Sequence, residues 1–175
     1  ETLAIEDAMI VSGKDTDGTL RTNVDSLTLE DIDTSVNLTN DGNLSIKQAD
    51  DDILGTLDIT ALGDLSIAGN VNSQDATANA IAFTSGGDMI FNADVTAATD
   101  ANSAITLTAG GDIVDANDAA TSTIDTPTLT ILGADNIGSS TGDDQLDIEV
   151  DTLTIALAGD GAAVSGDTYI REEDG

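Results

Sequence analysis

Hydrophobic residues recur along this chain in short alternating runs that repeat at an interval of about 24 residues. The phrase AIAFTSGGDMIF at 80–91 returns as AITLTAGGDIVD at 104–115. Within each phrase apolar and polar residues alternate, which is the period of a half-buried strand. No stretch carries the sustained i, i+3, i+4, i+7 stripe of an amphipathic helix. The pattern therefore predicts an all-β chain built from many short strands.

Rows of 24 residues align the hydrophobic positions in three columns. The first column contains Leu57, Ile81, Ile105, Leu129 and Leu153. The second contains Ile59, Phe83, Leu107, Ile131 and Ile155. The third contains Leu65, Met89, Ile113 and Ile137. Such a repeat is typical of solenoids, in which each coil offers its neighbour the same shape. We predict a β-solenoid of about seven coils, with these columns as inward-facing ladders.

Each row turns between its first two strands at a corner of glycine and aspartate. The corners read Gly63-Asp64, Gly86-Gly87-Asp88 and Gly110-Gly111-Asp112. We expect glycine there because it tolerates a positive φ. We expect aspartate because its side chain hydrogen-bonds nearby backbone.

The two ends of the chain resemble each other at a longer interval. VDSLTL at 24–29 and VDTLTI at 150–155 lie 126 residues apart, and TLAI at 2–5 matches TLTI at 128–131 at the same offset. We interpret residues 1–175 as one β-solenoid segment with a super-repeat of about 126 residues, in which 1–42 is echoed by 127–175. A unit whose C-terminal sequence resembles its N-terminal sequence is suited to stacking in tandem. The expected partners are therefore further copies or repeats of the same chain, end to end.

The charge balance limits the other partners. The sequence contains 34 acidic residues and 4 basic ones, which gives a formal net charge of -30. We expect no nucleic-acid binding, because phosphate contacts need clustered lysine and arginine. We also expect no membrane insertion, because no apolar run reaches the length of about 18 residues that a spanning helix requires.

The sequence offers little for catalysis. It contains no histidine, and with so many acidic residues no pair of carboxylates stands out as a hydrolase pair. We therefore expect no enzymatic activity and no required cofactor.

Calcium is the one cation for which candidate ligands can be named. GKDTDGTL at 13–20 matches the middle of a calcium loop through Asp15 and Asp17, but Gly13 and Val24 stand where the first and last ligands belong. The other candidate ligands are Asp50, Asp51, Asp52, Asp143 and Asp144. The alternative interpretation, which we favour, is that these aspartates are corner residues and a solvated acidic coat.

Two further binding functions remain open. Outward columns of threonine, with Thr106, Thr130 and Thr154 in one and Thr128 and Thr152 in the other, are compatible with binding an ordered surface such as ice. Threonine is also common on exposed strands, because β-branched residues favour extended backbone. A carbohydrate-binding module usually presents aromatic platforms. The only tyrosine is Tyr169, and we expect both phenylalanines to be buried.

Several phrases resemble a known family. GNLSI at 42–46, AITLTAGGDI at 104–113 and ADNIGSSTGDDQLDIEVDTLTI at 134–155 are similar to the filamentous haemagglutinin-like repeats of large bacterial exoproteins. The resemblance implies a right-handed parallel β-helix that is exported and lies at the bacterial cell surface. It also implies a structural repeat unit of an extracellular fibre or adhesin stalk. The alternative is an adhesive module that binds carbohydrate or another surface.

Overall fold

The computed structural model describes residues 2–6, 20–30, 32–33, 35–49, 52–97, 100–116, 122–140, 145–156 and 164–172. These residues form three sheets and no helix, and all the strands pair in parallel. The six-stranded sheet contains, in spatial order, β1 (Thr2–Glu6), β3 (Ser26–Glu30), β5 (Leu44–Gln48), β7 (Leu65–Ile67), β10 (Met89–Phe91) and β13 (Ile113–Asp115). The seven-stranded sheet contains β2 (Leu20–Thr22), β4 (Val36–Asn40), β6 (Leu57–Ala61), β9 (Ile81–Ser85), β12 (Ala104–Ala109), β15 (Thr128–Gly133) and β17 (Thr152–Ile155). The five-stranded sheet contains β8 (Val71–Ser73), β11 (Val95–Ala97), β14 (Thr123–Asp125), β16 (Leu146–Glu149) and β18 (Ile170–Glu172).

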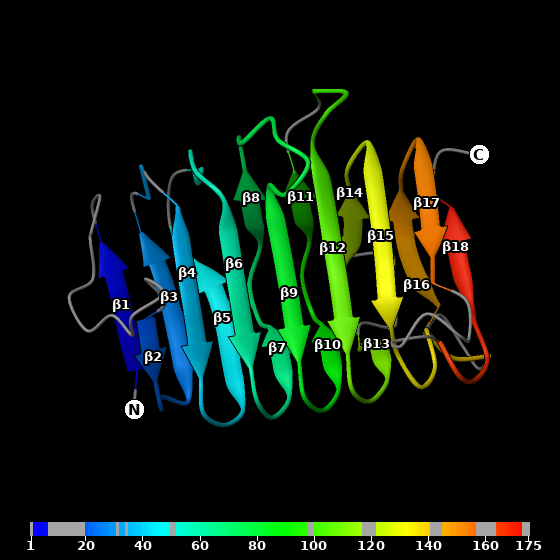
Figure 1. Cartoon of the computed structure of the whole chain (residues 1–175), viewed down its shortest axis with the longest axis horizontal. Coiled ribbons are helices and arrows are strands. Elements are labelled where there is room, and N and C mark those ends of the chain that lie inside the picture. The colour runs from blue at the N-terminus through cyan, green and yellow to red at the C-terminus, as the bar shows by residue number, and fades with distance from the viewer. Residues whose placement is uncertain are drawn as a thin grey trace.

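From β6 to β15 successive strands visit the three sheets in turn. Before β6 they alternate between the six-stranded and seven-stranded sheets, and after β15 between the seven-stranded and five-stranded sheets. This winding path makes the chain a β-solenoid. In Figure 1 the strands of the seven-stranded sheet run downward at the front, and those of the other two sheets run upward behind them. The coils advance from the N-terminus on the left to the C-terminus on the right. The predicted fold and its 24-residue interval are confirmed, and the strands make about five turns where we expected about seven.

The three predicted columns coincide with pairs of residues in register. Leu57 pairs with Ile81, Ile59 with Phe83, and Leu65 with Met89. The same columns continue through the later coils as far as Leu153, Ile155 and Ile137. Most members are completely buried. Each coil thus buries its hydrophobic face against the next, which supplies about 1.5–3 kcal/mol for each large side chain.

The last strand departs from the expected inward ladder. The side chain of Leu153 is 38% exposed, and that of Ile155 is half-buried. Both lie on β17, the last strand of the seven-stranded sheet, which among the described residues has a neighbouring strand only on the side of β15. These two residues therefore lack the second neighbour that covers the same column in the central coils.

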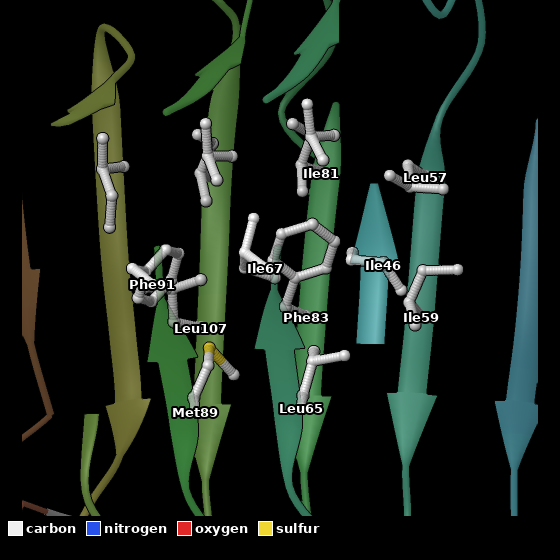
Figure 2. Close-up of a cluster of buried hydrophobic side chains, with 14 of the residues drawn as sticks. Ile46, Leu57, Ile59, Leu65, Ile67, Ile81, Phe83, Met89, Phe91 and Leu107 are labelled. Carbon is white, nitrogen blue, oxygen red and sulfur yellow. The ribbon is translucent and has the colours of Figure 1, made fainter. Parts of the chain in front are cut away.

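Two phenylalanines fill the middle of the solenoid. Phe83 of β9 and Phe91 of β10 are each 1% exposed. Figure 2 shows their rings among aliphatic side chains, including those of Ile67 and Leu107. Because aliphatic residues supply almost all of the remaining core, each coil presents a similar layer to its neighbour.

The 126-residue echo joins segments from different sheets. β1 lies in the six-stranded sheet, whereas its echo β15 lies in the seven-stranded sheet. β3 and its echo β17 differ in the same way. A shift along the axis alone therefore does not superimpose the two copies, and the super-repeat of about 126 residues stays a prediction.

Candidate functional site

Most of the candidate calcium ligands lie outside the described residues, namely Asp15, Asp17, Asp50, Asp51, Asp143 and Asp144. Asp52 is described, and its exposed carboxylate accepts a hydrogen bond of 3.1 Å from Gln74 Nε2. Within the described ranges, no three histidine, cysteine, aspartate or glutamate side chains are grouped so that they could hold a metal ion. The structure thus brings no calcium site together from the residues it places.

One corner of the solenoid carries a continuous ladder of polar side chains, which we call the corner ladder. Its members are Asn43, Asp64, Asp88, Asp112, Asn136 and Asp167. The Oδ1 atom of each of the first five accepts a hydrogen bond of 2.9–3.0 Å from the backbone N–H of the next member. The expectation that corner aspartates bond to backbone is therefore confirmed, and the bonded backbone belongs to the following coil.

The corner glycines are required for a different reason from the one we expected. Among the described glycines the positive φ belongs to Gly138, at 62°, and to none of the predicted corner positions. At Gly63, Gly87 and Gly111 an added Cβ would lie 2.0–2.2 Å from the Oδ1 of the preceding ladder residue. Glycine is needed there because the side chain of the previous coil occupies the space that a Cβ would fill.

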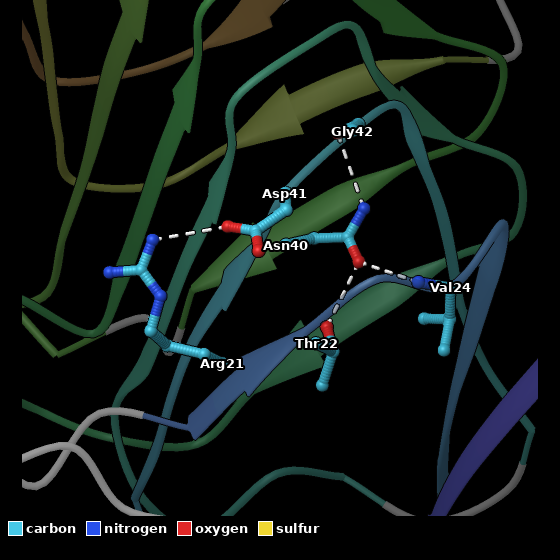
Figure 3. A network of polar contacts seen from close by, with 6 residues as sticks. All are labelled: Arg21, Thr22, Val24, Asn40, Asp41 and Gly42. Atoms are coloured by element: carbon cyan, nitrogen blue, oxygen red, sulfur yellow. Dashed lines mark hydrogen bonds and ion pairs between the residues drawn. The ribbon is translucent and has the colours of Figure 1, made fainter.

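Asn40 organises the N-terminal corner without offering a binding site. Its side chain is completely buried. Its Oδ1 accepts hydrogen bonds of 2.9 Å from Thr22 Oγ1 and the Val24 N–H, and its Nδ2 donates to the carbonyls of Gly42 and Asn43 (Figure 3). These four bonds use the whole hydrogen-bonding capacity of an amide side chain. The role of Asn40 is therefore structural.

Two aspartates are buried at positions that the hydrophobic pattern does not mark as polar core. Asp115 follows Phe91 in an inward column, is 1% exposed and accepts a hydrogen bond of 2.6 Å from Ser122 Oγ. Asp147 is also 1% exposed and forms an ion pair of 2.5 Å with Arg171, its register partner on β18. Asp115 takes an inward position that Ile67 and Phe91 fill in the preceding coils, and alternation along β16 would have placed Asp147 outside.

The outer face of the seven-stranded sheet carries the predicted threonine columns. Thr106 pairs with Thr130, which pairs with Thr154, and Thr128 pairs with Thr152. The structure adds a column that the sequence analysis missed, made of Thr39, Thr60, Thr84 and Thr108. The 24-residue rows could have revealed its last three members, but the shorter preceding coil shifts Thr39 out of line.

Two carboxyl groups on outer faces are perturbed by their surroundings. Desolvation by burial raises the pKa of Asp58 on β6 and the pKa of Asp125 on β14 above the ordinary aspartate value. The cause is the partial removal of water from a charged group, which favours the neutral form. The two residues lie on different sheets, so they do not form a catalytic pair.

A cavity of about 310 Å³ opens beside the corner ladder towards the C-terminal end. Its lining includes two serines together with Asp112, Val114, Asn136, Gly138, Asp167 and Tyr169. The volume is near the lower end of the range of about 300–1,000 Å³ that is usual for small-molecule sites. This cavity is a candidate binding site that the sequence did not predict.

No family model, no curated protein and no solved structure matches the sequence. Among the described residues there is no helix with the length and apolar character needed to cross a membrane. The interpretation of function therefore depends on the geometry of the chain itself.

Proposed function

We propose that this chain is a structural repeat unit of a long extracellular bacterial surface fibre or adhesin stalk. We further propose that it belongs with the filamentous haemagglutinin-like repeats, whose phrases its sequence resembles. The observation that carries the proposal is the continuity of the three parallel sheets along one axis. Each coil contacts mainly its two neighbours, so the fold can be lengthened by adding coils without a new core.

The proposed mechanism is mechanical extension. Backbone hydrogen bonds run along the axis in all three sheets, and the aliphatic columns inside them resist bending. The corner ladder adds a side-chain bond between successive coils along one edge. In the full segment we propose a right-handed solenoid of about seven coils. The path in Figure 1, which runs down in front and up behind while advancing, supports that hand.

We propose that the preferred partners are further repeats or copies of the same chain, joined end to end. Parallel strands at either end, such as β2 and β17, have a described strand on one side only, and such edges can pair with another strand. The acidic coat opposes lateral association, because like charges repel at a net charge of -30. Cations, calcium among them, would screen that repulsion.

Electron microscopy of the native assembly, with and without a calcium chelator, tests this proposal. We expect long thin fibres whose width is that of one solenoid. Persistence of the fibres in chelator would mean that cations act by screening alone, and their loss would assign calcium a specific structural role. Discrete compact particles would contradict the proposed fibre. Antibody labelling of intact cells tests the surface location separately.

A further inference from the structure

The cavity exists because one outward column lacks a side chain. Ile113 and Ile137 are bridged in register, so Val114 and Gly138, the residues that follow them, occupy neighbouring positions on the same face. Ile137 is bridged in turn to Thr168, which brings Tyr169 to the next position. Gly138 thus leaves an empty layer between Val114 and Tyr169, which are about 10 Å apart along the axis at two strand spacings.

The empty layer is held open by the backbone. Gly138 has a φ of 62°, a conformation that disfavours any residue with a Cβ. Its N–H donates to the carbonyl of Ile113, and the N–H of Tyr169 donates to the carbonyl of Ile137. The floor and one wall of the cavity are therefore fixed by the parallel ladder that builds the solenoid, and the site is preformed.

The polar edge of the cavity presents two carboxylates and a phenol hydroxyl, from Asp112, Asp167 and Tyr169. Asp112 Oδ1 accepts hydrogen bonds from the backbone and side chain of Asn136, which fixes the orientation of that carboxylate. In the part of the chain that the structure describes, the carboxylate of Asp167 and the hydroxyl of Tyr169 form no hydrogen bond. Both side chains line the cavity. They are therefore available to a bound molecule.

We propose that this cavity binds a pyranose ring of a glycan that carries no acidic groups. The apolar side of a sugar ring packs against an aromatic ring, which Tyr169 supplies, with Val114 across the gap. Sugar hydroxyls donate hydrogen bonds, and the carboxylates of Asp112 and Asp167 are acceptors only. A single ring fits the missing layer because the cavity volume is only about 310 Å³.

The charge of the chain sets the specificity. At a net charge of -30 the surface repels sialylated and sulfated glycans, and two carboxylates at the site strengthen that repulsion. Neutral and amino sugars meet no such penalty. This proposal does not depend on the proposed fibre, since a compact stand-alone domain would carry the same cavity.

Binding should first be screened on a panel of neutral, amino, sialylated and sulfated oligosaccharides, with spermidine as a cation that is not a sugar. The strongest non-acidic sugar is then titrated into the ¹⁵N-labelled chain and followed by NMR. We expect saturable shifts at Val114, Gly138 and Tyr169, with a dissociation constant on the order of 1 mM for a monosaccharide. We expect no binding to the acidic glycans.

Variants distinguish sugar binding at this cavity from non-specific binding elsewhere on the surface. Tyr169→Ala should weaken binding at least tenfold, and Asp167→Asn should weaken it several-fold. Tyr169→Phe keeps the ring and should retain most of the affinity, which guards against a folding defect in the alanine variant. Asp88→Asn is the matched control, because Asp88 is a ladder residue that does not line the cavity.

Three results would overturn the proposal. The first is the absence of a saturable response to any non-acidic sugar. The second is sugar binding that a folded Tyr169→Ala variant leaves unchanged. The third is a response at the cavity to spermidine but not to sugars, which would reassign it to cationic amines.

Discussion

The Oδ1 atom of Asp64 lies 2.1 Å from the point where a Cβ on Gly87 would be, one coil further along the axis. That oxygen also accepts a hydrogen bond of 3.0 Å from the backbone N–H of Asp88. The same relationship recurs between Asp88 and Gly111. Gly87 and Gly111 are therefore each paired with the aspartate of the preceding coil, and the two residue types are required together.

Gly87→Ala should therefore destabilise the chain by about 1–3 kcal/mol, because the new methyl group displaces Asp64 and leaves an N–H without its acceptor. Chemical denaturation followed by circular dichroism measures the effect. Gly42→Ala is the control, since the nearest atom to a Cβ there is 3.7 Å away. The glycine substitution should cost less in an Asp64→Ala background, where the obstructing oxygen is absent. An equal cost in both backgrounds would contradict the pairing.

The inward register predicts opposite effects for two adjacent residues. Ile105 is completely buried between Ile81 and Leu129, whereas Thr106 lies on the outer face and is half-buried. Ile105→Asp should cost several kcal/mol, because an unpaired charge enters an apolar stack. Thr106→Asp should change the melting temperature far less. Similar losses in the two variants would be incompatible with this register.

Much of the fold could be predicted from the sequence because it repeats. A column such as Leu57, Ile81 and Ile105 recurs at the interval set by coil length, and the same three residues pair in the sheet. The reason for glycine at the corners could not be predicted in that way. A close contact between Asp64 and Gly87 depends on where one coil lies above the next, and a one-dimensional pattern does not contain that distance.

The candidate site was missed for a related reason. Its floor is a single glycine, Gly138, and a glycine in a glycine-rich chain is a weak signal. Tyr169 is the only tyrosine in the sequence, but its position opposite Val114 depends on the bridge from Ile137 to Thr168. That bridge spans 31 residues, so the regular 24-residue rows do not align it.

The pKa directions of Asp58 and Asp125 predict how stability depends on pH. Burial raises the pKa of each carboxyl group above its ordinary value, so the folded chain takes up protons at a higher pH than the unfolded chain. Stability should therefore rise as the pH falls from 7 towards the ordinary aspartate pKa of about 4. Relief of repulsion within the acidic coat acts in the same direction. Thermal melts between these pH values measure the slope.

The double variant Asp58→Asn, Asp125→Asn should flatten this slope, because it removes two carboxyl groups whose pKa is raised by burial in the folded chain. Asp151→Asn removes a charge from an exposed position and serves as the control. A variant slope no flatter than that of the control would assign the whole pH dependence to general repulsion.

The two described arginine–aspartate pairs differ in burial and should therefore differ in energetic weight. Arg171 binds Asp147, whose side chain is 1% exposed, whereas Arg21 binds Asp41 at 3.1 Å with both side chains about half exposed. Arg171→Met should destabilise the chain by about 3–5 kcal/mol, because a buried carboxylate loses its guanidinium. Arg21→Met should cost no more than about 1 kcal/mol, because exposed pairs are screened by water and salt. Denaturant unfolding of both variants at low and high salt tests the difference, and only the Arg21 effect should shrink as salt is added. Equal costs for the two substitutions would mean that burial of Asp147 does not set the strength of its pair.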